Sequence, residues 1–154
     1  MKVRQGFVSN SSSSSFIVID SSGQFDIPHY DEKLIVDQNF GEFEFGWGPD
    51  TITDVNSRII FAYLQADAIN KTEWIAKLEA VIKANTDVKE IVWRITADYS
   101  KVDDKAWDRL EYGYVDHQSS SGEGENVEMF KSKKALKAFL FGRESKIVLD
   151  NDNH

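Results

Sequence analysis

Apolar and polar residues in the first third of the chain follow patterns that are typical of β-strands. Phe16-Ile17-Val18-Ile19 is an apolar, β-branched run that serines precede and that the turn signal Asp20-Ser21-Ser22-Gly23 follows. Residues 34–36 form a second candidate strand, and residues 42–45 alternate polar and apolar with the period of a half-buried strand. Gly46-Trp47-Gly48-Pro49-Asp50 is expected to end this β-rich region.

The apolar spacing then changes to three and four residues, as amphipathic helices require. Asp54 is a good N-cap for a helix whose apolar positions continue to Ile69. Asn70 or Thr72 is expected to cap a second helix that ends near Asn85. Because the link between them is so short, the two helices are predicted to pack as a hairpin.

The rest of the chain mixes strands with one more helix. The predicted elements are a central strand over 89–96, a helical turn over 102–110, a strand over 112–115, a helix capped by Ser132 and closed by Gly142, and a strand over 147–149. Strands and helices do not alternate regularly, which favours the α+β class over a doubly wound sheet. We therefore expect one domain over 1–154, with a mixed or antiparallel sheet packed against a helical hairpin and a short C-terminal helix. A flexible surface loop over 118–126 and a polar tail over 150–154 complete the prediction.

Composition narrows the possible functions. The 154-residue chain has no cysteine, which excludes thiol catalysis, iron–sulfur clusters and cysteine-based zinc sites. Its formal net charge of -8 argues against wholesale binding of nucleic acid. No apolar run approaches the length that spans a bilayer, and no secretion signal is visible at the start, so we expect no membrane association.

Charge is unevenly distributed along the sequence. Nine acids and a single lysine, Lys33, lie between Asp20 and Asp54, whereas bases dominate from Lys131 to Lys146. Trp47 stands within the acidic segment, between two glycines, and is expected to be exposed. An exposed tryptophan among acids predicts a contact for the basic groove of another protein, although both charged segments could equally be ordinary solvated surface.

A row of hydroxyl side chains lies near the start of the chain. It comprises Ser9, Asn10, Ser11, Ser12, Ser13, Ser14 and Ser15. Serine hydroxyls and consecutive backbone N–H groups can bind an anion, which makes the row a candidate phosphate site, although it lacks the Gly-Lys-Ser/Thr ending of a P-loop. Two alternatives stay open, namely hydroxyls bonded to backbone at a sheet edge and a flexible serine segment.

The same N-terminal residues carry a family resemblance. Met1-Lys2-Val3-Arg4-Gln5-Gly6-Phe7-Val8-Ser9-Asn10-Ser11, continuing to Phe16, resembles the N-terminal signature of a group of small uncharacterised proteins from tailed bacteriophages and some bacteria. The likeness extends more weakly to residues 114–119, 139–141 and 150–153. It implies a phage or mobile-element origin, and hence a location in the host cytoplasm or the virion. It assigns no catalytic residue.

Two further segments offer ligand chemistry. Asp116, His117 and Ser119 lie where a predicted strand gives way to a loop, and residues 117 and 119 share a strand face. Asp150 and Asp152 supply oxygen ligands at alternating positions for a hard cation, although the glycine and distant glutamate of an EF-hand loop are missing. A solvated acidic tail is the simpler interpretation of the second segment.

Three functions remain as hypotheses. The first is a non-enzymatic, phage-type accessory protein that binds a host or viral macromolecule, most simply a protein, through the acidic segment around Trp47. The second is a small hydrolase or nucleotide-binding protein whose pocket joins the serine row to Asp116, His117 and the Asp150 end. The third is a minor virion component. The residues identify no cofactor and no oligomeric state.

Overall fold

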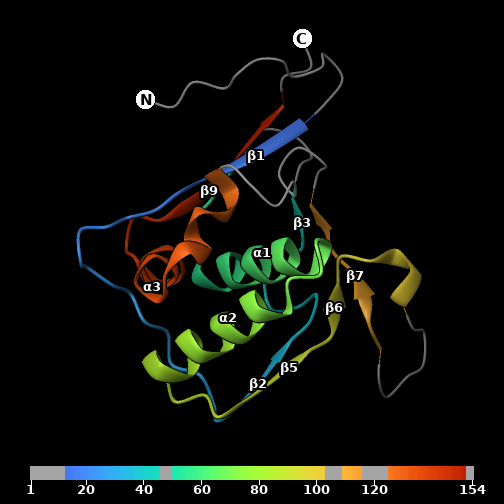
Figure 1. Ribbon diagram of the computed structural model, residues 1–154, viewed down its shortest axis with the longest axis horizontal. Coiled ribbons are helices and arrows are strands. Elements are labelled where there is room, and N and C mark those ends of the chain that lie inside the picture. The colour runs from blue at the N-terminus through green and yellow to red at the C-terminus, as the bar shows by residue number, and fades with distance from the viewer. Residues whose placement is uncertain (1–12, 46–49, 103–108, 116–124, 152–154) are drawn as a thin grey trace.

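Three α-helices in the described part of the chain share an apolar core. The computed structural model describes residues 13–45, 50–102, 109–115 and 125–151. Helix α1 (Val55–Ala68) runs through the centre with α2 (Thr72–Asn85) beside it, and α3 (Lys133–Phe141) packs against both. Small groups of strands lie around this helical centre (Figure 1). The predicted α+β class, with a helical hairpin and a short C-terminal helix, is confirmed.

Helix α1 begins where the sequence predicts. The Asp54 carboxylate accepts hydrogen bonds from the Ser57 backbone N at 2.9 Å and from Ser57 Oγ at 2.7 Å, so it satisfies an otherwise orphaned donor of the first turn. The predicted cap of α2 is wrong, because Lys71 occupies the N-cap position without a side-chain hydrogen bond. Asn70 instead takes a left-handed backbone conformation (φ 58°) in the tight link between the helices.

The largest sheet contains three antiparallel strands in the order β1-β9-β4. They are β1 (Ser13–Val18), β9 (Lys146–Asn151) and β4 (Asp50–Ile52). Ile17, Ile147 and Ile52 lie opposite one another across the three strands, and all three are buried. Strand β4 was not predicted, because Gly48-Pro49-Asp50 indicates a turn and only pairing with the distant β9 makes the next residues extended.

Three parallel strand pairs complete the architecture. They are β2 (Lys33–Val36) with β5 (Glu90–Trp93), β3 (Glu44–Phe45) with β8 (Tyr114–Val115), and β6 (Ile95–Thr96) with β7 (Glu111–Tyr112). The strand predicted over 89–96 is present as β5 and β6, but within the described residues each of them pairs with a single strand, so the prediction that it is central in a sheet is wrong. Gly113 divides the predicted strand over 112–115 in two, with its N–H donating to the Thr96 carbonyl at 2.8 Å.

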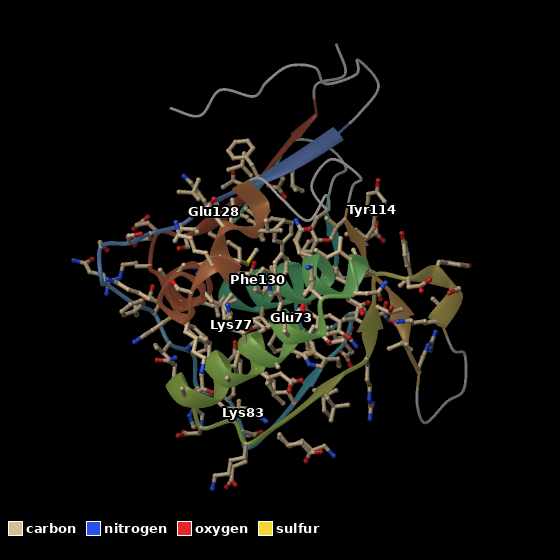
Figure 2. All side chains as sticks on the ribbon, viewed as in Figure 1. Glu73, Lys77, Lys83, Tyr114, Glu128 and Phe130 are labelled. Atoms are coloured by element: carbon tan, nitrogen blue, oxygen red, sulfur yellow. The ribbon has the colours of Figure 1, made fainter. Side chains whose placement is uncertain are left out.

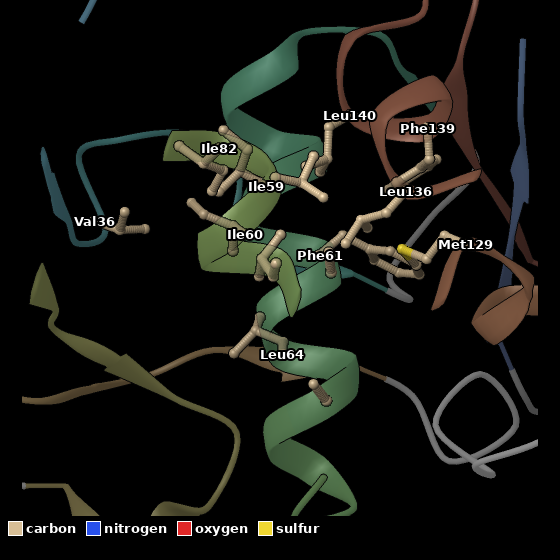
Figure 3. Packing of buried hydrophobic residues seen from close by; sticks show 14 of the residues in the cluster. Val36, Ile59, Ile60, Phe61, Leu64, Ile82, Met129, Leu136, Phe139 and Leu140 are labelled. Atoms are coloured by element: carbon tan, nitrogen blue, oxygen red, sulfur yellow. The ribbon is translucent and has the colours of Figure 1, made fainter. Parts of the chain in front are cut away.

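Aromatic and aliphatic side chains of α1 and α3 form the middle of the core. The Phe61 ring lies 5.0 Å from that of Phe45 and 6.3 Å from that of Phe139, measured between centroids. Figure 3 shows Phe61 among Leu136, Phe139 and Met129. These side chains are fully buried, so α1 is anchored to α3 mainly by apolar contact.

Two 3-10 helices connect the main elements. They are η1 (Tyr99–Lys101) and η2 (Glu125–Lys131), so the last two residues of the loop predicted over 118–126 belong to η2. Lys77 of α2 donates from Nζ to the carbonyl of Phe130 at 2.7 Å, which ties η2 to the hairpin (Figure 2). Of the helical turn predicted over 102–110, residues 103–108 lie outside the described part of the chain.

The C-terminal helix forms as its sequence predicts. Ser132 accepts a hydrogen bond from the backbone N of Ala135 at 3.0 Å, and Gly142 closes α3 with its N–H donating to the Ala138 carbonyl. A Cβ on Gly142 would lie 2.2 Å from that carbonyl oxygen, so the close chain approach requires glycine. Both ends of α3 are therefore set by local sequence.

Candidate functional site

A polar hollow opens where the 41–42 loop meets β4 and the N-terminus of α1. Its volume is about 370 Å³, and we call it the acidic cleft. Its lining residues are Gly41, Glu42, Asp50, Thr51, Ile52, Thr53, Asp54 and Ser57. Three carboxylates and three hydroxyls thus converge from segments on both sides of positions 46–49.

Ser57 holds the two sides of the acidic cleft together. Its Oγ accepts a hydrogen bond from the Glu42 backbone N at 2.8 Å and donates to the Asp54 carboxylate at 2.7 Å. A Cβ on Gly41 would lie 2.9 Å from both the backbone N and the Oγ of Ser57, so the loop reaches the helix only because residue 41 is glycine. Ser57 is itself buried, which makes this junction a fixed part of the cleft.

The carboxylates of the acidic cleft face solvent. Glu42, Asp50 and Asp54 are all exposed, and none forms an ion pair with a lysine or arginine of the described residues. Asp50 accepts the backbone N–H of Thr51 at 2.8 Å. A carboxylate has lone pairs for several donors, so each of these groups retains accepting capacity for a cationic partner.

Asp20 and Asp26, at the start of the acidic segment, do not line the acidic cleft. Asp26 lies 3.4 Å from the Arg143 guanidinium, and Asp20 accepts the backbone N–H of Glu144 at 2.9 Å. Backbone hydrogen bonds from Ser22 and Glu144 lower the pKa of the Asp20 carboxyl. The start of the acidic segment thus meets the end of the basic segment here, through one ion pair and one backbone hydrogen bond.

Arg58 supports the cleft from inside and was not singled out by the sequence. Its side chain is buried, and its guanidinium donates to the carbonyls of Thr53 at 3.0 Å, Phe139 at 3.0 Å and Gly142 at 2.7 Å. Burial lowers the pKa of Arg58, and the nearby carboxylates of Asp54, Asp26 and Asp20 oppose that shift. One cation therefore fixes the Thr53 wall of the cleft to the end of α3.

A second hollow of about 630 Å³ lies between the 29–32 loop and the end of α2. Its lining carries charges of both signs: Lys89 lies 3.4 Å from Glu32, and His29 Nδ1 lies 3.5 Å from the Asp87 carboxylate. These side chains are largely exposed, so the pairs are weak surface contacts. This hollow therefore has lysines beside its carboxylates, whereas the acidic cleft is lined by no lysine or arginine.

The described end of the serine row lies in a sheet. Strand β1 begins at Ser13, and antiparallel pairing sets Ser13 opposite Asn151, Ser14 opposite Asp150 and Ser15 opposite Leu149. The candidate binding row and the candidate cation ligand Asp150 are therefore backbone neighbours. Asp150 and Asn151 also belong to β9, so the tail predicted over 150–154 begins inside a strand.

The other predicted site residues lie outside the described residues. They are Ser9, Asn10, Ser11, Ser12, Trp47, Asp116, His117, Ser119 and Asp152. Within the described ranges, no three histidine, aspartate or glutamate side chains are grouped so that they could hold a metal ion.

Comparison with known proteins assigns no function to this chain. No family model, curated protein or solved structure matches the sequence or the fold. No helix among the described residues is both long enough and apolar enough to cross a membrane. The charge and geometry of the acidic cleft are therefore the main guide to function.

Proposed function

We propose that the chain is a non-enzymatic, phage-type accessory protein that binds a lysine- or arginine-rich segment of a host or viral protein in the acidic cleft. The observation that carries the proposal is the convergence of Glu42, Asp50 and Asp54 on one hollow without ion-pair partners in the described chain. The resemblance of the N-terminal residues to phage proteins supports the proposed origin.

The chemistry of the acidic cleft suits a basic peptide better than a small substrate. A lysine ammonium offers three donors and an arginine guanidinium five, which matches three carboxylates with free lone pairs. Thr51 and Thr53 add hydroxyls at the same edge. Because the whole chain carries a net charge of -8, a basic partner is also attracted over a distance before it docks.

The test compares two charge reversals of equal size. Glu42→Lys with Asp50→Lys removes two cleft carboxylates and leaves the Asp54 helix cap intact. Glu90→Lys with Glu144→Lys makes the same change in net charge at two exposed positions that do not line the cleft. Binding of a fluorescein-labelled decalysine peptide is followed by fluorescence anisotropy at several salt concentrations.

The wild-type chain should bind decalysine, and its affinity should fall as salt rises. The cleft variant should bind at least about tenfold more weakly, whereas the control variant should stay within about threefold of the wild type; tenfold corresponds to about 1.4 kcal/mol. Equal losses in both variants would mean that net charge alone attracts the peptide. Absence of binding by the wild type would also reject the proposal.

A second candidate function is supported by the register of β1 and β9. Ser14 pairs with Asp150 and Ser13 with Asn151, so two of the segments needed for a phosphate or nucleotide site lie side by side. A hydrolase or nucleotide-binding protein would still require Asp116 and His117 to join them. Thermal unfolding in the presence of nucleotides and divalent cations tests this idea, because a ligand at 100 times its Kd stabilises by about 2.7 kcal/mol. Unchanged Tm with every nucleotide and cation would reject it.

A further inference from the structure

The parallel pair β2–β5 turns one of its faces away from the core. Leu34 and Val36 of β2 are buried in the apolar core, and Ile91 and Trp93 of β5 pack against it. The Trp93 ring stacks on that of Tyr63 of α1 with 4.1 Å between centroids. Because side chains alternate along a strand, the residues between these four point away from the helices. In Figure 1 the two strands lie below α1 and α2, and no described helix or strand lies beyond them in this view.

The side chains on the outward side form three rows across the two strands. We call them the β2–β5 face, and its members are Lys33, Ile35, Asp37, Glu90, Val92 and Arg94. The parallel register places Lys33 beside Glu90 and Ile35 beside Val92. The Arg94 N–H donates to the Val36 carbonyl at 2.8 Å, so the ladder continues by one residue to Arg94, and Asp37 is the residue that follows β2.

The middle row of the β2–β5 face is apolar and accessible. Ile35 is 38% exposed, which makes it one of the few large apolar side chains that the described residues leave exposed. Val92 beside it is half-buried and does not belong to the core. Parallel strands occur almost only where both faces of the sheet are covered. An uncovered row of β-branched residues on a parallel pair is therefore typical of a surface that another layer covers.

Charged residues flank this apolar row in an order that is complementary to itself. At one end Lys33 of β2 stands beside Glu90 of β5, and at the other end the acid, Asp37, follows β2 while the base, Arg94, follows β5. None of these four side chains forms an ion pair within the described part of the chain. Each therefore retains its capacity for a partner of opposite charge.

A second copy of the chain fits this order of charges. A two-fold axis parallel to the strands exchanges the β2 and β5 sides of the face. Lys33 of one copy then meets Glu90 of the other, Asp37 meets Arg94, and the apolar rows pack together between them. Contacts across a two-fold axis are of this kind, because the same patch is used on both subunits. A partner of uniform charge would instead meet two like charges, which is unfavourable.

We propose that the β2–β5 face is the contact surface of a homodimer with two-fold symmetry. Six side chains per copy are far fewer than the roughly 20–30 residues that each partner contributes to a standard interface, so the dimer is weak and reversible. The proposal does not depend on the acidic cleft, since no residue of the face lines that hollow.

The experiment measures self-association of the full chain by sedimentation equilibrium, at concentrations from about 10 µM to about 1 mM, where weak dimers form. Three variants test the charges, namely Lys33→Glu, Glu90→Lys and the double exchange of both, which keeps the wild-type net charge. Ile35→Thr removes the apolar centre and keeps a β-branched side chain. Ile27→Thr is the matched control, because Ile27 is 42% exposed in another segment. Circular dichroism establishes that each variant is folded.

The wild type should dimerise in this range. Lys33→Glu, Glu90→Lys and Ile35→Thr should each raise the dimer Kd about threefold or more, whereas Ile27→Thr should leave it unchanged. The double exchange should restore the wild-type Kd, and an equimolar mixture of the K33E and E90K chains should form a heterodimer, because every like-charge contact then becomes an opposite one. This rescue distinguishes a contact between copies from a general loss of stability.

Three results would overturn the proposal. The first is a wild type that stays monomeric at every concentration, and the second is a dimer whose Kd none of the face variants changes. The third is a dimer that is lost in the variant with Glu42→Lys and Asp50→Lys, since the copies would then meet through the acidic cleft. Decalysine binding by Ile35→Thr should equal that of the wild type, which keeps failure of this proposal separate from failure of the proposed function.

Discussion

Replacement of Arg58 should destabilise the protein more than any surface substitution, because its guanidinium satisfies carbonyls from two distant segments. Arg58 is only 2% exposed, and it donates to Phe139 and Gly142 at the end of α3 as well as to Thr53 before α1. A cation at a helix C-terminus also interacts favourably with the helix dipole. The Arg58 side chain therefore links the start of α1 to the end of α3, and it satisfies carbonyls that apolar packing alone would leave without a donor.

The expected loss can be worked from these contacts. Each buried carbonyl left without a donor costs about 1–3 kcal/mol, and such losses add incompletely within one network. Arg58→Ala should therefore lower the free energy of unfolding by about 3–5 kcal/mol, the range for removing one partner of a buried polar network. Arg58→Met keeps much of the apolar stem, so its loss should remain above about 2 kcal/mol if the hydrogen bonds carry the effect.

Urea unfolding followed by tryptophan fluorescence measures both variants. Arg143→Ala is the matched control, because Arg143 is half exposed and its pair with Asp26 spans 3.4 Å in solvent. That control should lose less than about 1 kcal/mol. The reasoning would be refuted if Arg58→Met unfolded at the wild-type midpoint with an unchanged m-value, since the carbonyl contacts would then contribute nothing measurable.

Three further substitutions test other parts of the fold. Gln65 is fully buried and its side-chain amide has no hydrogen-bond partner among the described residues, so Gln65→Leu should stabilise by about 1–2 kcal/mol and raise the Tm in calorimetry. An unchanged or lower Tm would show that the amide is satisfied in solution. Gly113→Ala should destabilise by about 1–3 kcal/mol in urea, because its Cβ would press on Leu64 and Ile95; wild-type stability would mean that these side chains yield freely. The pKa of Asp20 lies below its ordinary value of 3.8 because backbone N–H groups bond the charged form. The contribution of the charged Asp20 to stability is therefore fully present above the unfolded-state pKa, and it is lost as pH falls through the lower folded-state pKa. In acid unfolding curves between about pH 5 and about pH 2, the free energy of unfolding of Asp20→Asn should thus fall less than that of the wild type. An equal dependence on pH in the two proteins would contradict this assignment.

Elements whose ends are set by neighbouring residues could be predicted from the sequence. Asp54 caps α1 and Ser132 caps α3 through bonds to residues three positions ahead, which a local pattern can reveal. Strand β4 could not be predicted in this way, because its three residues are extended only through pairing with β9, almost a hundred positions later. The two-residue strands β3, β6 and β8 lie within segments predicted as strands and β7 overlaps one, but their parallel pairing depends on distant residues and could not be predicted from a local pattern.

In the candidate site, too, a local sequence pattern reveals some residues, whereas others depend on contacts with distant segments of the chain. The sequence identified the acidic segment that contains Glu42 and Asp50, but it could not indicate that Asp20 and Asp26 turn toward the end of α3. Arg58 was missed because one arginine in a helix is typical of an exposed position. The contact between the Tyr99 and Tyr112 rings could not be predicted either, because β6 and β7 must pair before these residues meet.

Amide NMR during a decalysine titration tests the proposed function most directly. In the ¹H–¹⁵N spectrum of the ¹⁵N-labelled chain, the largest shift changes should fall on Glu42, Thr51 and Asp54, while amides of α3 and of residues 111–115 should move little. Changes spread evenly over the exposed acids, or centred on the second hollow near Asp87, would contradict the assignment of the acidic cleft as the binding site.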